Sequence, residues 1–128
     1  MAKKYTENRK KIFNLITNSE KPLNADQIYD ILRPDVNLST VYRGIEYLQS
    51  KKLIRSVSFG SVIKYFYSSN QHKHFLYCED CHEIMVFNDC AAEKLQKAVT
   101  KKFNFNIDDH VFYFVGTCEK CQKKRGDM

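Results

Sequence analysis

The sequence predicts an α+β protein in two parts, a helical part that ends in a strand hairpin and a smaller part fastened by cysteines. Three observations support this fold class. Apolar residues recur at helical spacing as far as Lys51, and two short strand-like runs then surround Gly60. Two Cys-x-x-Cys pairs follow, at Cys78–Cys81 and Cys118–Cys121.

Three helices are expected in the first part. Thr6 is a candidate cap of the first helix. Asn24 opens the second, Gln27 stands three residues later as a capping-box partner, and Pro34 ends it. The residues expected to be buried on the three helices are Ile12, Phe13, Leu15, Ile16, Ile28, Ile31, Leu32, Leu38, Val41, Ile45 and Leu48.

The third helix, capped by Asn37 or Ser39 and running to about Lys51, is the candidate reader of DNA. A helix fits the major groove, and its polar face carries side chains that can contact phosphates and bases. Arg43 is favoured, because a guanidinium can pair with guanine or with phosphate, although a solvated surface arginine is the alternative. The candidate DNA-binding residues are Ser39, Thr40, Tyr42, Arg43, Arg9, Lys10 and Lys64.

A hairpin is predicted from Leu53 to Tyr67, with its turn at Phe59-Gly60-Ser61 and its return strand over Val62–Tyr67. The tight turn between the second and third helices favours a helix-turn-helix. A hairpin that follows such a motif is a wing, so Arg55 and Lys64 could contact the DNA backbone, while plain core packing is the alternative. In the second part the expected strands are Phe75–Cys78, Ile84–Phe87, Phe105–Ile107 and Val111–Val115, with an amphipathic helix over Ala91–Phe103.

Charge is divided unevenly between the two parts, whose boundary we expect in a polar stretch between domains 1–69 and 70–128. Residues 1–70 hold 12 Lys/Arg and 6 Asp/Glu, whereas residues 71–128 hold 9 of each. The basic first part points to nucleic acid as partner, with a merely soluble basic surface as the alternative. No stretch approaches the roughly 18 apolar residues that span a membrane, so no membrane partner is expected.

The two cysteine pairs supply the four sulfur ligands of a closed tetrahedral zinc site. Because 36 residues separate Cys81 from Cys118, the metal would pin together the ends of a small domain. The start of the chain shows no secretory signal, which predicts the reducing cytoplasm, where structural disulfides are rare. Disulfides or a redox dithiol are the alternatives. The fifth cysteine, Cys90, is interpreted as a small half-buried apolar residue, with a metal or redox role as the alternative.

These features together resemble the ferric uptake regulator family of bacterial metal-dependent transcription factors. Ser39-Thr-Val-Tyr-Arg43 matches the recognition-helix signature of the family, and Thr6-x-x-Arg9 resembles its first-helix motif. The resemblance implies a winged helix-turn-helix domain, a C-terminal α/β dimerisation domain, and a homodimer that binds double-stranded DNA operators. The metal-ligating residues that follow the family order are His72, His74, Cys78, Cys81, Glu93, His110, Cys118 and Cys121.

In the resemblance the four cysteines hold structural Zn²⁺, and His72, His74, Glu93 and His110 form a second, regulatory site. Three imidazoles and a carboxylate suit a divalent transition metal, and zinc accepts four ligands readily. The alternatives are a solvated Glu93 and a surface-loop His110. Many members have a further sensing site. In this chain its expected positions are occupied by residues that cannot bind a metal, which are Pro22, Phe66, Lys73, Phe75 and Val86. Either the histidine site is the sensor, or metal responsiveness is lost.

We therefore expect a metal-responsive repressor of metal homeostasis, with Zn²⁺ favoured as effector over Fe²⁺ or Mn²⁺. An iron, manganese or peroxide-stress regulator of the same family is one alternative, although the absent sensing site weakens the peroxide interpretation. A zinc-stabilised protein adaptor without sensing is another. An enzyme is not expected, because four protein ligands leave a metal no open position for substrate.

Overall fold

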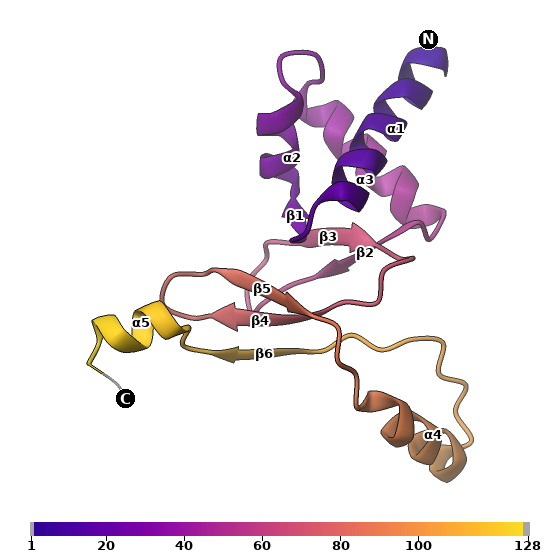
Figure 1. Cartoon of the computed structure of the whole chain (residues 1–128). Coiled ribbons are helices and arrows are strands. Elements are labelled where there is room, and N and C mark those ends of the chain that lie inside the picture. Colours follow the sequence, from indigo (N-terminus) through magenta and orange to yellow (C-terminus); the bar gives the residue numbers. More distant parts are fainter. Residues whose placement is uncertain (1, 127–128) are drawn as a thin grey trace. The chain divides into compact units, whose positions relative to one another are not determined.

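A computed structural model describes the backbone of residues 2–126 and the side chains of residues 5–126. The chain forms two compact units, Met1–His72 and Lys73–Met128, which divide a few residues beyond the predicted boundary. Its elements, labelled in Figure 1, are α1 (Ala2–Asn18), β1 (Leu23–Asn24), α2 (Ala25–Leu32), α3 (Leu38–Ser50), β2 (Ile54–Val57), β3 (Tyr65–Ser68), β4 (His74–Cys78), β5 (Ile84–Phe87), α4 (Ala92–Phe103), β6 (Tyr113–Gly116) and α5 (Glu119–Lys124).

Local capping sets the starts of α2 and α3. The Asn24 side chain accepts from the Gln27 N–H at 2.8 Å, and the Gln27 side chain accepts from the Asn24 N–H at 2.9 Å. This reciprocal pair confirms the predicted capping box. Asn37 caps α3 by accepting from the Thr40 N–H at 2.9 Å. The predicted cap at Thr6 is wrong, because α1 begins earlier, in a stretch whose alanine, lysines and glutamate favour helix.

The hydrophobic core of the first unit lies where the three helices meet β2 and β3. Gly44 lets α1 and α3 approach closely, since a Cβ at this position would lie 2.5 Å from Ile12 Cδ1. Ile31 and Leu38, predicted to be buried, are instead 57% and 36% exposed; on α2 it is Leu32, the residue after Ile31, that packs against the core. The core residues are Ile12, Ile16, Ala25, Ile28, Val36, Val41, Ile45, Leu48, Ile54 and Phe66.

A small antiparallel sheet of order β1-β3-β2 lies to one side of these helices in Figure 1. The predicted hairpin is confirmed, with Ile54 opposite Ser68 at one end of the β2–β3 pairing. Gly60 lies in the connection with a φ of 79°, which glycine adopts without strain. The return strand begins at Tyr65, later than predicted, and Val62 before it is 95% exposed. The two-residue strand β1 was not predicted.

The second unit contains a sheet of order β5-β4-β6, in which β4 pairs antiparallel with β5 and parallel with β6. Residues 105–107, predicted as a strand, pair with neither sheet. Leu76 of β4 lies opposite Met85 on one side and Phe114 on the other. These three side chains are 38%, 48% and 58% exposed, so an apolar row crosses the sheet without being buried. Among the described residues, no helix has the length and apolarity to cross a membrane.

Candidate metal centres and nucleic-acid interface

Four cysteine sulfurs converge in the second unit. The Sγ atoms of Cys78, Cys81, Cys118 and Cys121 all lie within 4.8 Å of one another. Cys81 Sγ and Cys118 Sγ are 3.7 Å apart, close to the ~3.8 Å between sulfurs that bind one zinc at ~2.3 Å in a tetrahedron. A disulfide would need about 2.05 Å, and all the cysteines are free thiols. The cluster therefore fits a single closed zinc site.

Two neighbouring strands deliver the two cysteine pairs to one end of the sheet. Strand β4 ends at Cys78, and the following turn is closed by hydrogen bonds from the His82 N–H to the Cys78 carbonyl at 2.8 Å and from the Cys78 N–H to the Glu83 carbonyl at 3.0 Å. The φ of His82 is 64°, which bends the chain after Cys81. Strand β6 runs parallel to β4 and leads to Cys118, the N-cap of α5.

The protein alone stabilises only part of the negative charge that four thiolates carry. Backbone N–H groups of Cys81 and Cys118 lower the pKa of Cys78 to about 6, and the Cys118 N–H lies 3.3 Å from the Cys78 sulfur. Contact with the Cys118 sulfur, together with burial, raises the pKa of Cys121 to about 12. A bound dication is what would allow all four sulfurs to ionise, so the donor set fits structural zinc.

A second group of ligand atoms comes from His72, His74, Cys90 and His110, all within 4.8 Å of one another. Three of these are the histidines that the sequence predicted for the regulatory site. Glu93, predicted as their partner, is exposed in the first turn of α4 and does not belong to this group. A carboxylate at that position is favourable to the helix dipole, which gives Glu93 a structural role without a metal.

Ring packing and hydrogen bonds hold this second group in place. His74 is 1% exposed, and its ring stacks on Phe112 with centroids 4.0 Å apart and on His110 at 5.2 Å. Cys90 Sγ lies 3.3 Å from His110 Nε2. On the other side of the ring, His110 Nδ1 donates to Gln96 Oε1 at 3.0 Å. Since Oε1 can only accept, a neutral His110 carries its lone pair on Nε2, directed at Cys90.

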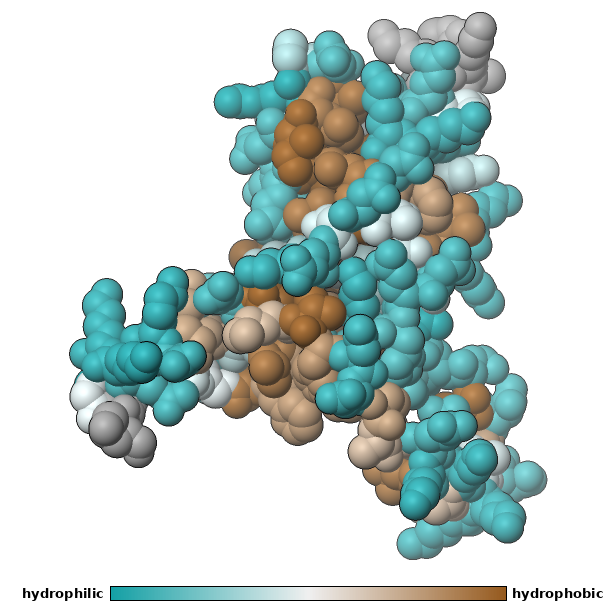
Figure 2. All heavy atoms as spheres, in the orientation of Figure 1, coloured by the Kyte–Doolittle hydropathy of each residue, from teal (hydrophilic) through white to brown (hydrophobic). Residues whose placement is uncertain are grey.

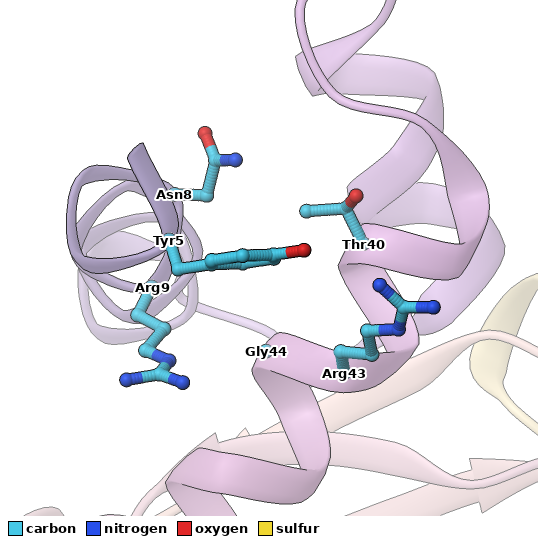
Figure 3. A pocket seen from close by; sticks show the side chains of 6 residues that line it. All are labelled: Tyr5, Asn8, Arg9, Thr40, Arg43 and Gly44. Atoms are coloured by element: carbon cyan, nitrogen blue, oxygen red, sulfur yellow. The ribbon is translucent and has the colours of Figure 1, made fainter. Parts of the chain in front are cut away.

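In the first unit, α1 and α3 border an open pocket of about 330 Å³ lined by Tyr5, Asn8, Arg9, Thr40, Arg43 and Gly44. Figure 3 shows the Tyr5 ring reaching from α1 toward Thr40 on α3, with Arg43 on the same side of α3. Arg9 stacks over the Tyr47 ring, with its guanidinium carbon 3.7 Å from the centroid. This cation–π contact ties α1 to α3 and leaves Arg9 half-buried.

The other predicted DNA-binding residues lie on exposed parts of the same unit. The Ser39 hydroxyl donates to Asn37 Oδ1 at 2.9 Å, so the helix cap also orients the first polar side chain of α3. Tyr42 is 52% exposed, and Lys10 and Lys64 are exposed as well. Tyr42 and Lys64 line a second pocket of about 460 Å³, so α3 and the loop before β3 lie side by side.

Comparison with known proteins identifies the family. The ferric uptake regulator family model matches residues 1–115. The chain belongs to the ferric uptake regulator family. It is 31% identical to the ferric uptake regulation protein of Staphylococcus epidermidis, over 94% of this chain and 88% of that protein. It is 27% identical to the ferric uptake regulation protein of Campylobacter jejuni, over 98% of this chain and 83% of that protein.

The fold agrees with that of solved family structures. The Campylobacter jejuni peroxide stress regulator superposes with a TM-score of 0.80 at 21% identity, covering 92% of this chain and 91% of that one. The predicted α+β class, with a winged helix-turn-helix domain and a dimerisation domain, is thereby confirmed. Proteins of the ferric uptake regulator family are metal-responsive, dimeric, DNA-binding transcription regulators and not enzymes, as predicted.

Sequence reasoning did not place two residues that the structure brings to His110, namely Cys90 of the second group and Gln96 beside it. Cys90 is the cysteine left over from the Cys-x-x-Cys pairs, and that count led to its interpretation as an apolar residue. The family resemblance had already marked Glu93 as a metal ligand. Cys90 precedes Glu93 by three residues, and this proximity was the signal that could have indicated a metal-binding role for Cys90. Gln96 gives no signal in the sequence, because its role depends on where His110 lies in the fold.

Proposed function

We propose that this protein is a cytoplasmic, zinc-responsive repressor that binds a double-stranded DNA operator as a homodimer when its second metal site is loaded. The observation that carries this proposal is the presence of two separate groups of metal-ligating side chains, one of four sulfurs and one rich in imidazole. The sulfur group suits a permanent structural Zn²⁺. The imidazole group suits an exchangeable divalent metal, for which Zn²⁺ is favoured over Fe²⁺ and Mn²⁺.

In this proposal the first unit reads the operator through the N-terminal half of α3. Ser39, Tyr42 and Arg43 contact base edges, because they are exposed there and the start of a recognition helix is the part that reaches the bases. Thr40 lines the adjoining pocket and joins them. Phosphate contacts come from Arg9, Lys10 and Lys64, which set the position of the helix without reading sequence.

The second unit is proposed to bind a second copy of this chain. Figure 2 shows hydrophobic side chains, in brown and tan, gathered over its sheet, where the row of Met85, Leu76 and Phe114 is exposed. Leu95 of α4 and Phe105 after it are 66% and 63% exposed. Apolar surface of this extent on a family of dimers is best explained by burial against an identical chain. Two recognition helices could then engage half-sites about one helical turn apart.

The metal is proposed to act through the segment that connects the two units. His72 is the last residue of the first unit, and His74, two residues later, belongs to the second. A metal held by these residues together with His110 would restrain this segment and so favour one spacing of the recognition helices. Couplings of this kind are typically about 1–3 kcal/mol, whereas a nearly complete switch needs about 5.5 kcal/mol. Both protomers would therefore have to contribute.

The test is operator binding by protein whose exchangeable metal has been removed with a mild chelator while its structural zinc remains. Adding Zn²⁺ should restore gel-shift binding, and His110→Ala should abolish this response while keeping fold and structural zinc. His82→Asn is the matched control, because it removes a histidine outside the group at a position whose positive φ suits asparagine. Equal operator affinity with and without added metal would overturn the proposal. Operator binding that is restored by Fe²⁺ or Mn²⁺ but not by Zn²⁺ would show that zinc is not the effector.

Reading and positioning can be separated by two further variants. Arg43→Ala should relax sequence preference without affecting dimerisation, whereas Lys10→Ala should weaken binding to all sequences and reduce the salt slope by about 0.9. A non-sensing protein adaptor, the other class considered, predicts no salt-dependent DNA binding at all. Unchanged operator selectivity in Arg43→Ala would remove this residue from the reading face.

A further inference from the structure

We propose that Cys90 supplies the fourth ligand of the second metal site, which makes it a three-histidine, one-thiolate centre in place of three histidines and a carboxylate. This inference rests on the proposed function, because it names the ligand set of the sensing site. It also assigns a chemical role to Cys90, the one cysteine that belongs to neither Cys-x-x-Cys pair.

The positions of the atoms favour Cys90 over Glu93. A zinc ion that binds sulfur at ~2.3 Å and nitrogen at ~2.05 Å in a tetrahedron sets these two atoms about 3.6 Å apart. Cys90 Sγ and His110 Nε2 are 3.3 Å apart, so both could bind one ion after a small shift. The ligand atoms of His72 and His74 lie within 4.8 Å of both. Glu93 is exposed and contributes no atom to this group.

The hydrogen bond from His110 to Gln96 prepares the site for a cation. A histidine that binds a metal through one nitrogen almost always donates its other N–H to a carbonyl, carboxylate or water. His110 meets this condition, because Nδ1 donates to Gln96 Oε1 while Nε2 is directed at the thiol. Gln96 is therefore a positioning residue, which fixes the tautomer and orientation of His110 without reaching the metal.

A thiolate changes which metals the site prefers. On binding the cation, the Cys90 thiol loses its proton to solvent, and a sulfur–metal bond forms in place of the S–H bond. Thiolate is a soft ligand that favours zinc and cobalt, whereas a carboxylate suits manganese and other hard cations. Three imidazoles and one thiolate therefore select for Zn²⁺ over Mn²⁺ at the step where the regulator distinguishes metals.

Cobalt is the probe that reports a sulfur ligand directly. Protein that keeps its structural zinc but has lost its exchangeable metal is titrated with Co²⁺ and followed by absorption spectroscopy. The wild type should bind one Co²⁺ per chain with a sulfur-to-cobalt charge-transfer band. Cys90→Ser should lose this band. Its affinity for Co²⁺ should also fall, and the loss should exceed the roughly 10–100-fold that is typical when a residue hydrogen-bonded to a metal ligand is removed. Glu93→Gln, the matched control three residues away, should keep both band and affinity.

The outcomes separate this inference from the proposed function. Stoichiometric Co²⁺ binding without a sulfur band, while operator binding stays metal-dependent, would overturn the assignment of Cys90 and leave the proposed function standing. The same holds if Glu93→Gln weakens binding and Cys90→Ser does not. No exchangeable Co²⁺ or Zn²⁺ in the wild type would overturn both.

Alkylation provides a measurement on the wild type that does not depend on any variant folding. Iodoacetamide labelling of Cys90, read by mass spectrometry of its peptide, should slow by at least about tenfold when Zn²⁺ is added, because a metal-bound thiolate is a poorer nucleophile. The cysteines of the quartet should be protected both before and after the addition. Labelling of Cys90 at the same rate with and without Zn²⁺ would contradict the inference.

Discussion

The two units of this chain differ in what holds each of them together. Every residue of the hydrophobic core cluster belongs to the first unit, where three helices and two strands converge. In the second unit neither α4 nor α5 buries a residue, and as far as residue 126 the buried side chains are few: His74, Phe75, Cys78 and Ile84. Half of that short list consists of metal-ligating residue types gathered in the two groups.

This difference shows that the two units are stabilised by different interactions. The first unit follows the ordinary route, in which burial of apolar area offsets the loss of conformational entropy. A second unit of comparable length cannot do so, because several of its large apolar side chains, among them Phe103, Phe105 and Phe114, remain on the surface. It depends on metal ligation, and on a partner chain, for what its own core lacks.

The largest expected effect comes from breaking the sulfur quartet with Cys118→Ser. Structural zinc contributes about 10–16 kcal/mol in small zinc-folded peptides, so its loss should unfold most of the second unit and spare the first. Hydrogen exchange with mass spectrometry should show rapid exchange in β4 to β6 and persistent protection in α1 to α3. Lys123→Ala, an exposed change in α5 that leaves all four sulfurs and the second group intact, is the control. Protection of β4 and β6 in Cys118→Ser would show that the second unit does not need its zinc.

The same difference explains how much could be predicted from the sequence. The capping box at Asn24 and the two Cys-x-x-Cys pairs were predictable, because each depends on residues a few positions apart. The grouping of Cys90 with His110 was not, since 19 residues separate them and only the tertiary fold brings them together. The strand predicted over 105–107 failed for a related reason: Phe105 and Ile107 follow a strand-like pattern, but no neighbouring strand pairs with them, and Phe105 remains exposed in the single chain.

Gly44→Ala tests whether the first unit really depends on close packing. The added Cβ would lie 2.5 Å from Ile12 Cδ1, and Ile12 is fully buried, so α1 and α3 must separate or Ile12 must change rotamer. Overpacking of this kind typically costs about 1–3 kcal/mol, which urea unfolding of the first unit should detect. Gly116→Ala is the control in the second unit, because nothing lies within 4 Å of its added Cβ. Equal stability of Gly44→Ala and wild type would mean that the core is looser than this contact implies.

A smaller effect is expected from removing the cap of the recognition helix. Asn37→Ala removes the acceptor for both the Thr40 N–H and the Ser39 hydroxyl, which should destabilise the first unit by about 1 kcal/mol. Because Ser39 loses its orientation, operator affinity should fall further than the change in stability explains. Asn14→Ala, at an exposed position inside α1, is the control and should be neutral or slightly stabilising. An equal loss of stability and operator affinity in both variants would show that replacing any helix asparagine has this effect, and that the cap is not its cause.

The smallest effect is expected from Arg125→Ala, which asks whether charge pairing could replace zinc in holding the two cysteine pairs together. The Arg125 guanidinium lies 3.1 Å from Asp80 Oδ2 and 3.3 Å from Thr117 Oγ1. In the sequence Asp80 lies within the first cysteine pair, and Thr117 directly precedes the second pair. The Arg125 and Asp80 side chains are 53% and 38% exposed, so solvent and salt screen the pair, and it should contribute less than about 1 kcal/mol. Thermal unfolding of the zinc-loaded variant should therefore match that of Lys123→Ala, which removes an exposed pair with Glu119 within α5. A loss as large as that of Cys118→Ser would mean that this ion pair is required to keep the two cysteine pairs together, and the contrast between a packed first unit and a metal-held second unit would fail.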